Sequence, residues 1–400
     1  MIVVVLSLDS VLSSTQIPQQ LKREGNIEDL LKNFDHVALL TQDTKNFTDY
    51  LDGIEHVPCA PSKSERIHRV LSRLAYLRWA YFYIYSSLWI LKHRGKIRLI
   101  VSIGVDSPAP LLSLLFGIRC VVYYHYDVAF QVSNINRRHV IGTLLLLLER
   151  FAFRRADTVW ITSPSLMSKV KMSAAKRIRI IPNWVDIQKI GSAQSSEERR
   201  AGFRVLFVGR LHQVKQVDLL IQAFQLVHAR IPSTSLYILG NGEQRQSLVK
   251  LTNNLGLSAS VHFEGQVDQK TVFTMMKKSD VLVLPSKVEG NPRVLIEAMA
   301  NRVPIVATNV PGIKEMIQHK KTGYLIDNQK PKDLAYSIEY VLRNKQDSTN
   351  MVKSAYAFAE QNFSKENVLK KIRGELELLL RARVSCNCIA FIVRKKTDLD

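Results

Sequence analysis

Two segments in the second half of the chain combine acidic and basic side chains in a pattern that suits a sugar phosphate. The first, PSKVEGNPRVLIEAMANRVPIVATNVPG at residues 285–312, carries Glu289 and Glu297, eight residues apart. The second, FVGRLHQVKQVDLLIQAF at residues 207–224, carries Arg210 and Lys215. Carboxylates accept strong hydrogen bonds from sugar hydroxyls, and Arg and Lys bind the oxygens of a diphosphate.

The segment with the two acids is expected to run from a strand through a loop into a helix. A buried strand is predicted at residues 281–285 and a helix at 293–301. Asn291 is a good N-cap and Pro292 a good first helical residue, which favours a helix beginning there. The first turn would then offer free N–H groups to a phosphate or a hydroxyl-rich ligand. The spacing alone favours a simpler explanation, in which one acid caps the helix and the other faces solvent.

The two cations follow another predicted strand, at residues 203–208. Gly209 permits a sharp exit from that strand, Arg210 comes next, and Lys215 stands just before a helix. Ligands of open α/β sheets bind at the carboxyl ends of strands, where a diphosphate would meet both cations. Because Lys and Arg are usually exposed, the segment by itself also fits two solvated surface cations.

The elements that must position these residues alternate along the whole chain. Such alternation of short apolar runs with helical patterns predicts parallel sheets covered on both faces. Strands are expected at residues 2–8, 36–40, 98–103, 120–124, 158–162, 203–208, 235–239, 260–264, 281–285, 304–308 and 324–327. Helices are expected at residues 136–155, 165–176, 217–230, 244–255, 269–277, 293–301, 313–319 and 331–343.

The alternation pauses in a polar stretch, IGSAQSSEERRAG, which predicts two domains. We expect a first doubly wound domain at residues 1–182, a linker at 183–202 and a second doubly wound domain at 203–362. A last helix is expected within 363–383, packing back on the first domain, before a tail at 384–400. Ligands of two such domains bind in the cleft between facing strand ends.

Together these segments resemble family 4 of the retaining glycosyltransferases (glycosyltransferase group 1). Its E-x7-E element matches at Glu289 to Glu297, and its V-G-R-L…K element matches at Gly209, Arg210 and Lys215. Further matches follow in the right order: IPNWVD at 181–186, LYILGNGE at 236–243, VHFEGQV at 261–267 and FSKENV at 363–368. The resemblance implies the GT-B fold, in which two Rossmann-like doubly wound domains face each other across a cleft. The first domain would serve the acceptor and the second the nucleotide sugar.

The resemblance also implies roles for the charged residues. Arg210 and Lys215, next to Gly209, would hold the diphosphate of the donor. Glu289 would lie at the transferred sugar, and Glu297 would bind the ribose of the nucleotide.

Further contacts are implied elsewhere along the chain. Backbone groups of Asn291, Pro292 and Arg293 would contact sugar and phosphate, and the loop with Val267 would meet the base. His125, in YYHYD at the end of a predicted strand, resembles the histidine that the family aims at the donor sugar. A capping or core histidine is the alternative for His125.

The predicted activity is a retaining, metal-independent transfer of a hexose of mannose or glucose type. The donor would be a UDP- or GDP-sugar and the acceptor a lipid-linked or glycan molecule, as in polysaccharide or glycolipid biosynthesis. No cofactor is expected, because Arg, Lys and helix N–H groups stabilise a leaving diphosphate without a metal. Two features depart from the family: the loop DSVLSSTQ at residues 9–16 lacks the usual glycine pair, and Gln216 stands where Gly commonly follows the lysine.

Two other functions remain to be weighed against sugar transfer. With 56 Lys+Arg against 35 Asp+Glu, the net charge of +21 favours an anionic partner. A basic nucleic-acid-binding protein is disfavoured, since the chain shows no helix-turn-helix, zinc or aromatic RNA-binding signature. A catalytically silent glycosyltransferase-like scaffold subunit stays open because of the missing glycine pair, although the four charged residues count against it.

A membrane surface is a further candidate partner. Residues 66–105 contain no Asp or Glu and several Lys and Arg, with seven aromatic residues between positions 76 and 89. Aromatic rings with basic flanks favour the headgroup region of an anionic bilayer, although the apolar run is too short to span it. An aromatic helix packed against the sheet explains the same pattern. The leucine run at 144–148 is expected to be ordinary core.

The cysteines and the first residues indicate a compartment. The four cysteines have neither zinc spacing nor a disulfide-framework pattern, and MIVVVLSLDS lacks the basic leader of a signal peptide. Reduced thiols in the cytoplasm are therefore expected, with the protein peripheral on the cytoplasmic face of the membrane if the 66–98 segment binds lipid.

Overall fold

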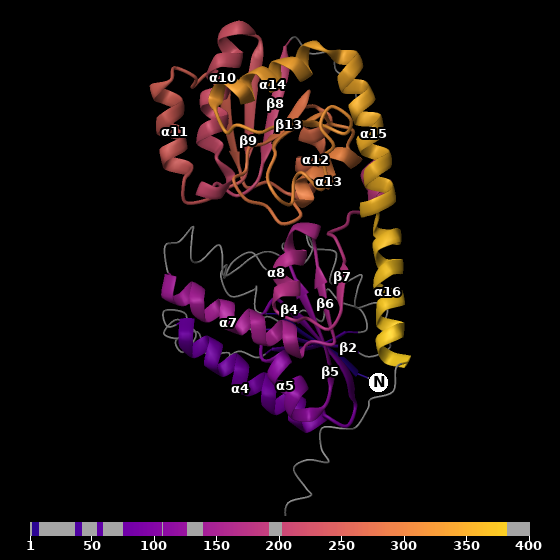
Figure 1. Ribbon diagram of the computed structural model, residues 1–400. Helices are drawn as coiled ribbons and strands as arrows, with labels where there is room; N and C mark the ends of the chain where they lie inside the picture. Colours follow the sequence, from indigo (N-terminus) through magenta and orange to yellow (C-terminus); the bar gives the residue numbers. More distant parts are fainter. Residues whose placement is uncertain are drawn as a thin grey trace, which may run out of the picture. The chain divides into compact units, whose positions relative to one another are not determined.

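The computed structural model describes residues 2–7, 37–41, 54–58, 75–105, 107–125, 139–191 and 202–381 (Figure 1). The chain divides into two compact units. Unit 1 comprises Met1–Thr162, Leu166–Ile181 and Leu369–Asp400, and unit 2 comprises Ser163–Ser165 and Pro182–Val368. Within the described ranges, no helix combines the length and apolar character needed to cross a membrane.

Unit 1 is built on a seven-stranded parallel sheet with the order β3-β2-β1-β4-β5-β6-β7. Its strands are β1 Ile2–Ser7, β2 Val37–Thr41, β3 Ile54–Pro58, β4 Ile97–Ile103, β5 Arg119–Tyr124, β6 Thr158–Ile161 and β7 Ile178–Ile180. The central strands β4 and β5 are almost wholly buried, as expected for parallel strands covered on both faces. The edge strands β3 and β7 were not predicted from the sequence.

The handedness of the crossovers decides on which face of the sheet the helices of unit 1 lie. They are α4 Ala75–His93, α5 Ala109–Phe116, α7 His139–Arg155, the short α8 Met167–Met172 and most of α16 Lys365–Arg381. Right-handed connections from β3 to β4, β4 to β5 and β5 to β6 all advance in one direction across the sheet. They therefore place α4, α5 and α7 on one face, where α5 contacts both others (Figure 1).

The last helix, α16, is fastened to unit 1 by ion pairs. Glu375 on α16 lies 3.0 Å from Arg177 Nη2 and 2.7 Å from Arg179 Nε, just before and on β7. Glu375 is only 14% exposed, so these contacts are partly shielded from solvent.

Helices α4 and α7 bury only their inner faces. On α4, Phe82 and Ile90 are buried, whereas Leu88 is 59% exposed. On α7, Leu144 and Leu147 are 56% and 57% exposed, so the expectation of ordinary core for the leucine run was wrong. The reason is that a helix packed on a sheet buries the face that meets the sheet and not the opposite one.

Unit 2 repeats the design with a six-stranded parallel sheet of order β10-β9-β8-β11-β12-β13. Its strands are β8 Phe203–Val208, β9 Thr234–Leu239, β10 Val261–Gly265, β11 Val281–Leu284, β12 Ile305–Thr308 and β13 Tyr324–Ile326. The chain moves outward from β8 to β10, then returns to place β11 beside β8. The order thus reverses between β8 and β11, the switch point where open α/β sheets bind ligands.

The helices of unit 2 cover this sheet. They are α9 Ile187–Gly191, η4 Gln213–Lys215, α10 Val217–Arg230, α11 Arg245–Asn254, α12 Gln269–Lys277, α13 Arg293–Ala300, α14 Pro331–Arg343 and α15 Lys345–Phe363. The helix expected at residues 313–319 was wrong: turns replace it. Ile313, Met316 and Ile317 have helical spacing and are buried, but a series of turns buries them without a continuous helix.

The first part of the segment expected to be a linker packs into unit 2. Ile187 and Ile190 belong to its hydrophobic core, and Trp184 is only 2% exposed. Val185 N–H donates to the Phe363 carbonyl at 3.1 Å, and Lys365 N–H donates to the Val185 carbonyl at 3.0 Å. Residues 192–201 of that segment lie outside the described residues, as does the DSVLSSTQ loop.

Candidate active site

The candidate site lies on the loops that follow β8 and β11. These neighbouring strands are parallel, so both loops leave from the same edge of the sheet at its switch point. The loop after β8 carries Gly209, Arg210 and Lys215, and the loop after β11 carries Ser286 and Glu289. Two segments far apart in sequence are thus brought to the edge where ligands bind.

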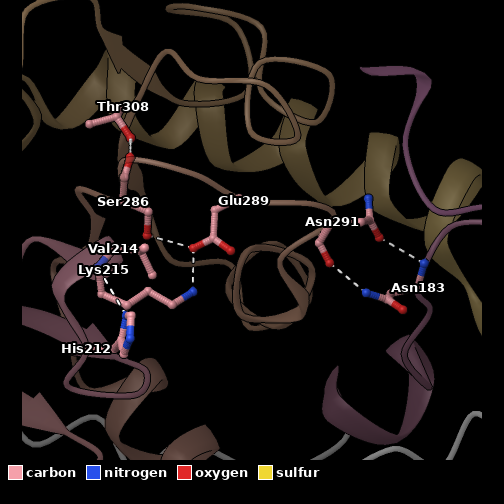
Figure 2. Close-up of polar contacts among 8 residues, drawn as sticks. All are labelled: Asn183, His212, Val214, Lys215, Ser286, Glu289, Asn291 and Thr308. Carbon is pink, nitrogen blue, oxygen red and sulfur yellow. Dashed lines mark hydrogen bonds and ion pairs between the residues drawn. The ribbon is translucent and has the colours of Figure 1, made fainter. Parts of the chain in front are cut away.

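An ion pair between Lys215 and Glu289 joins the two loops. Lys215 Nζ lies 2.5 Å from Glu289 Oε1, although the residues are 74 positions apart (Figure 2). The side chains are only 22% and 9% exposed, so the pair is largely shielded from water. Ser286 Oγ donates to the same Oε1 at 2.6 Å. Glu289 Oε2 makes no hydrogen bond within the described part of the chain, which leaves it available to a ligand hydroxyl.

Backbone and hydroxyl contacts hold the loop after β11 in place. Thr308 Oγ1 donates to the Ser286 carbonyl at 2.5 Å, which ties the loop to the end of β12 (Figure 2). Lys287 N–H donates to the Val214 carbonyl at 2.8 Å, a second link to the loop after β8. At Gly312, with φ of +85°, a Cβ would lie 2.4 Å from the Glu289 carbonyl oxygen. A glycine is therefore needed for the following loop to pack against Glu289.

Lys215 is positioned by a short 3-10 turn, η4. His212 caps this turn, its Nδ1 accepting from Val214 N–H at 3.3 Å, and Lys215 N–H donates to the His212 carbonyl at 2.9 Å. His212 Nε2 lies 3.5 Å from a Glu243 carboxylate oxygen. Gln216 ends the turn in the left-handed conformation, with φ 46° and ψ 47°. The position that departs from the family is thus one where glycine has no steric cost.

Arg210 lies on the same loop but does not join the ion pair. Its side chain is exposed and makes no hydrogen bond or ion pair within the described ranges. The backbone around it is fixed, since Leu211 N–H donates to the Asn241 carbonyl at 3.0 Å. A Cβ at Gly242 would lie 2.3 Å from the Leu211 carbonyl oxygen, so this glycine permits the two loops to touch.

The helix after Glu289 begins at the predicted residue, Arg293, but the residues before it do not have the predicted roles. Helix α13 spans Arg293–Ala300 with Pro292 as its N-cap, and no side chain of the described residues caps it. Asn291 was expected to be the cap, but its Oδ1 accepts from Asn183 N–H at 2.8 Å, and Asn183 Nδ2 donates to the Asn291 carbonyl at 2.6 Å (Figure 2). The amide turns inward because it satisfies a backbone N–H there. The mouth of α13 is left open to an anion.

Two further residues stand near this helix mouth. The Nε atom of Arg293, the first helical residue, is buried without a hydrogen-bond partner among the described residues. Glu297 follows in the second turn, where Gln269 Nε2 donates to its Oε1 at 3.4 Å. Gln269 begins α12, and Val267 precedes it by two positions. The loop after β10 is thereby linked to α13.

His125 stands in unit 1, at the carboxyl end of β5. Its ring lies 4.0 Å from that of Tyr123, and its carbonyl accepts from Thr162 Oγ1 at 2.7 Å. Burial lowers the pKa of His125 to about 4, so the ring is neutral at pH 7. Its Nε2 is buried and has no hydrogen-bond partner in the described part of the chain. A neutral, unpartnered ring nitrogen of this kind can serve a ligand hydroxyl.

The structure thus groups most of the residues predicted for the site. Lys215 and Glu289 touch, Gly209 and Arg210 share the loop of Lys215, and Asn291 to Arg293 begin two positions after Glu289. Sequence reasoning missed the partners that fix these residues, which are Asn183, Ser286 and Thr308. Ser286 and Asn183 lie inside the quoted motifs PSKVEG and IPNWVD, which was the available signal.

Part of the chain matches a known family model. Residues 192–358 match the model described as Glycosyl transferases group 1. An uncharacterized glycosyltransferase of Haemophilus influenzae is 30% identical over 173 residues, covering 43% of this chain and 48% of that protein. Alpha-D-kanosaminyltransferase of Streptomyces kanamyceticus is 25% identical over 303 residues, covering 70% of this chain and 78% of that protein. The chain spans about half the length of the Haemophilus influenzae protein that it matches.

The fold is shared with solved structures over nearly the whole chain. The crystal structure of HepE from Anabaena in complex with UDP aligns with a TM-score of 0.74 at 20% identity, covering 94% of this chain and 99% of that one. The predicted α/β class, the GT-B fold with two Rossmann-like domains, is confirmed by this likeness.

The buried His125 predicts a pH dependence of stability. Its pKa of about 4 lies below the ordinary 6.5, so the unfolded chain takes up a proton first as the pH falls. The contribution of the neutral His125 ring to the free energy of unfolding is therefore complete above pH 6.5 and is lost progressively as the pH falls toward 4. The free energy of unfolding is measured in urea at pH 7 and at pH 5. Between these pH values it should fall by about 2 kcal/mol more in the wild-type protein than in His125→Asn. Parallel losses in the two proteins would contradict the buried neutral ring.

The left-handed Gln216 predicts a gain of stability on replacement by glycine. Gln216→Gly removes a strained conformation and a buried amide oxygen that has no partner among the described residues. The free energy of unfolding in urea should therefore rise by about 1 kcal/mol. The control is Gln213→Gly in the same turn, where φ is not positive. The free energy of unfolding of that variant should fall by about 0.5–1 kcal/mol, since glycine there only adds conformational freedom to the unfolded chain. A destabilised Gln216→Gly would refute the strain argument.

Proposed function

We propose that this protein is a retaining glycosyltransferase that moves a hexose of mannose or glucose type from a UDP- or GDP-sugar to an acceptor. The observation that carries the proposal is the shielded Lys215–Glu289 pair at the β8/β11 switch point, beside the uncapped N-terminus of α13. Group 1 glycosyltransferases match this part of the chain, and the similarly folded HepE was solved with UDP.

The donor diphosphate would be held by positive groups at this edge. Lys215 offers a point charge, Arg210 an exposed guanidinium on the same loop, and Arg293 a buried Nε that has no partner among the described residues. The open N–H groups of α13 add the positive end of its dipole. Groups fixed in this way stabilise the charge that grows on the diphosphate as it leaves.

The transferred sugar would lie against Glu289. Oε1 is occupied by Lys215 and Ser286, so Oε2 would accept a hydrogen bond from a sugar hydroxyl. Retention would follow from front-side attack. The acceptor oxygen bonds to the anomeric carbon, the bond to the phosphate oxygen breaks on the same face, and the acceptor proton passes to that oxygen.

The remaining predicted residues complete the proposal. Glu297 would accept hydrogen bonds from the ribose hydroxyls, and Val267 would contact the base. His125 would use its unpartnered Nε2 at the donor sugar. The acceptor would be a lipid-linked or glycan molecule, which places the reaction in polysaccharide or glycolipid biosynthesis.

Substitutions of the ion pair test this function. Lys215→Met should weaken binding of UDP or GDP about 10- to 100-fold in calorimetric titrations, because a charge-assisted contact with the diphosphate is lost. Glu289→Gln should bind the nucleotide within about threefold of wild type and lose about 100-fold or more in turnover. Lys332→Gln, an exposed lysine on α14, is the control and should change neither. Near-normal turnover in Glu289→Gln would reject its place at the sugar.

We also propose that the transfer needs no metal, and chelation tests this. The nucleotide sugar that gives product in a donor panel is assayed with and without EDTA. Its turnover with EDTA should stay within about twofold of the untreated value, because side-chain cations and helix N–H groups act on the diphosphate. Activity that disappears with EDTA and returns with Mn²⁺ or Mg²⁺ would show that a metal does this instead. Nucleotide binding without any product, across a panel of donors and acceptors, would favour the silent subunit.

A further inference from the structure

Three neighbouring helices of unit 1 expose apolar side chains on their outer faces. Most of the exposed large apolar side chains among the described residues belong to α4, α5 and α7. They are Ile84, Tyr85, Leu88 and Leu91 on α4, Leu111, Leu114 and Leu115 on α5, and Leu144, Leu146, Leu147, Leu148 and Phe151 on α7. We name this set the outer apolar face.

The spacing of these residues makes continuous stripes. Ile84, Leu88 and Leu91 recur at helical intervals on the side of α4 opposite the buried Phe82 and Ile90. Leu111, Leu114 and Leu115 repeat the pattern on α5, and Leu144, Leu147, Leu148 and Phe151 repeat it on α7. Because α5 contacts both α4 and α7, the three helices that carry these stripes are neighbours (Figure 1). A patch of this extent marks an interaction surface.

Basic side chains border the outer apolar face. Lys92 and Arg94 are exposed at the end of α4, and Arg150, Arg154 and Arg155 are exposed on α7. Helices α4 and α5 contain no acid, and the acid of α7, Glu149, is only 1% exposed and lies 2.6 Å from Lys169. The outward side of these three helices is therefore apolar and positive, without a compensating negative charge.

We propose that the outer apolar face docks on an anionic membrane leaflet. Its leucines would enter the headgroup and acyl boundary, while the basic side chains pair with lipid phosphates. The charges favour lipid over a second copy of this chain, because a two-fold contact would bring the arginines of both copies together. The proposal goes beyond the single aromatic helix indicated by the sequence, since α5 and α7 take part. It does not depend on sugar transfer.

Vesicle flotation of the full chain tests the proposal. Wild-type protein should float with vesicles of phosphatidylglycerol and phosphatidylcholine in 100 mM NaCl, and weakly with pure phosphatidylcholine. Binding should fall as the salt rises to 500 mM, because the basic border is screened. Absence of binding to the anionic vesicles overturns the proposal, whatever the result of the glycosyltransferase assays.

Exposed substitutions separate the outer apolar face from general stickiness. Leu88→Gln with Leu147→Gln, at 59% and 57% exposure, should weaken vesicle binding at least about tenfold. The matched control is Tyr336→Gln with Leu378→Gln, at 60% and 53% exposure on α14 and α16, which should bind like wild type. Equal binding by the two double variants overturns the proposal. Thermal unfolding should be unchanged in both, since each side chain is exposed.

A second set of variants tests the charges without touching the leucines. Arg150→Gln, Arg154→Gln and Arg155→Gln together should weaken binding about 100-fold. The control replaces three exposed lysines of unit 2, Lys250, Lys332 and Lys353, with Gln and should retain binding. Light scattering gives the remaining outcome. If the wild-type protein is a dimer, the leucine variant is a monomer and neither binds vesicles, the outer apolar face is a contact between copies. That result would overturn the membrane proposal.

Discussion

The site depends on one constraint, which is that a nearly buried carboxylate must have a partner. Glu289 is only 9% exposed, and an ion in such a place is costly unless it is paired and hydrogen-bonded. Lys215 and Ser286 supply that pairing on a single oxygen, so the same contacts that make the burial tolerable also fix the direction of the other oxygen. Because Lys215 comes from the loop after β8 and Glu289 from the loop after β11, the pair also joins the two loops at the switch point of the sheet. A phosphate arriving there would share the lysine with the carboxylate and would find a cation already in place.

The neighbouring contacts show how the helix mouth is kept open. An asparagine before a helix usually caps it, which would fill the N–H groups that an anion needs. Here the side chain of Asn291 lies inward, where its Oδ1 accepts from the backbone N–H of Asn183, 108 positions away, and the Asn183 amide donates to the Asn291 backbone carbonyl. The helix is left with Pro292 at its N-cap, which has no side-chain acceptor to offer. Gly312 allows the next loop to pack against the Glu289 backbone, which adds a contact beside the open helix mouth. A binding site that is fixed before the ligand arrives loses less freedom on binding.

The sequence predicts best where burial follows local periodicity. The strand at 203–208 and the helices at 217–230, 269–277 and 331–343 have the predicted bounds, because each carries an uninterrupted apolar pattern. The turns at 313–319 carry the same periodicity without a helix, and the edge strand β7 is half-exposed and therefore lacks an apolar run. At the site, charged residue types and their motifs indicate the chemistry. The partners that aim them do not follow from local pattern, since the contacts of Asn183 with Asn291 and of Thr308 with Ser286 join segments distant in sequence.

The leucines of α7 show why apolar character alone cannot decide between core and surface. A run such as Leu144 to Leu148 is apolar on every side of its helix, but the sheet beneath can cover only one of those sides. The outward residues therefore contribute little to the stability of unit 1, and in water they favour aggregation. Nothing in the architecture of the sheet requires them, because polar residues on the outer side would leave the inner packing of Phe153 and Ala152 unchanged. These leucines lie on three adjacent helices that also carry exposed basic residues and, in their described parts, no exposed acid. The pattern is explained when the working protein covers this face with an apolar and anionic surface.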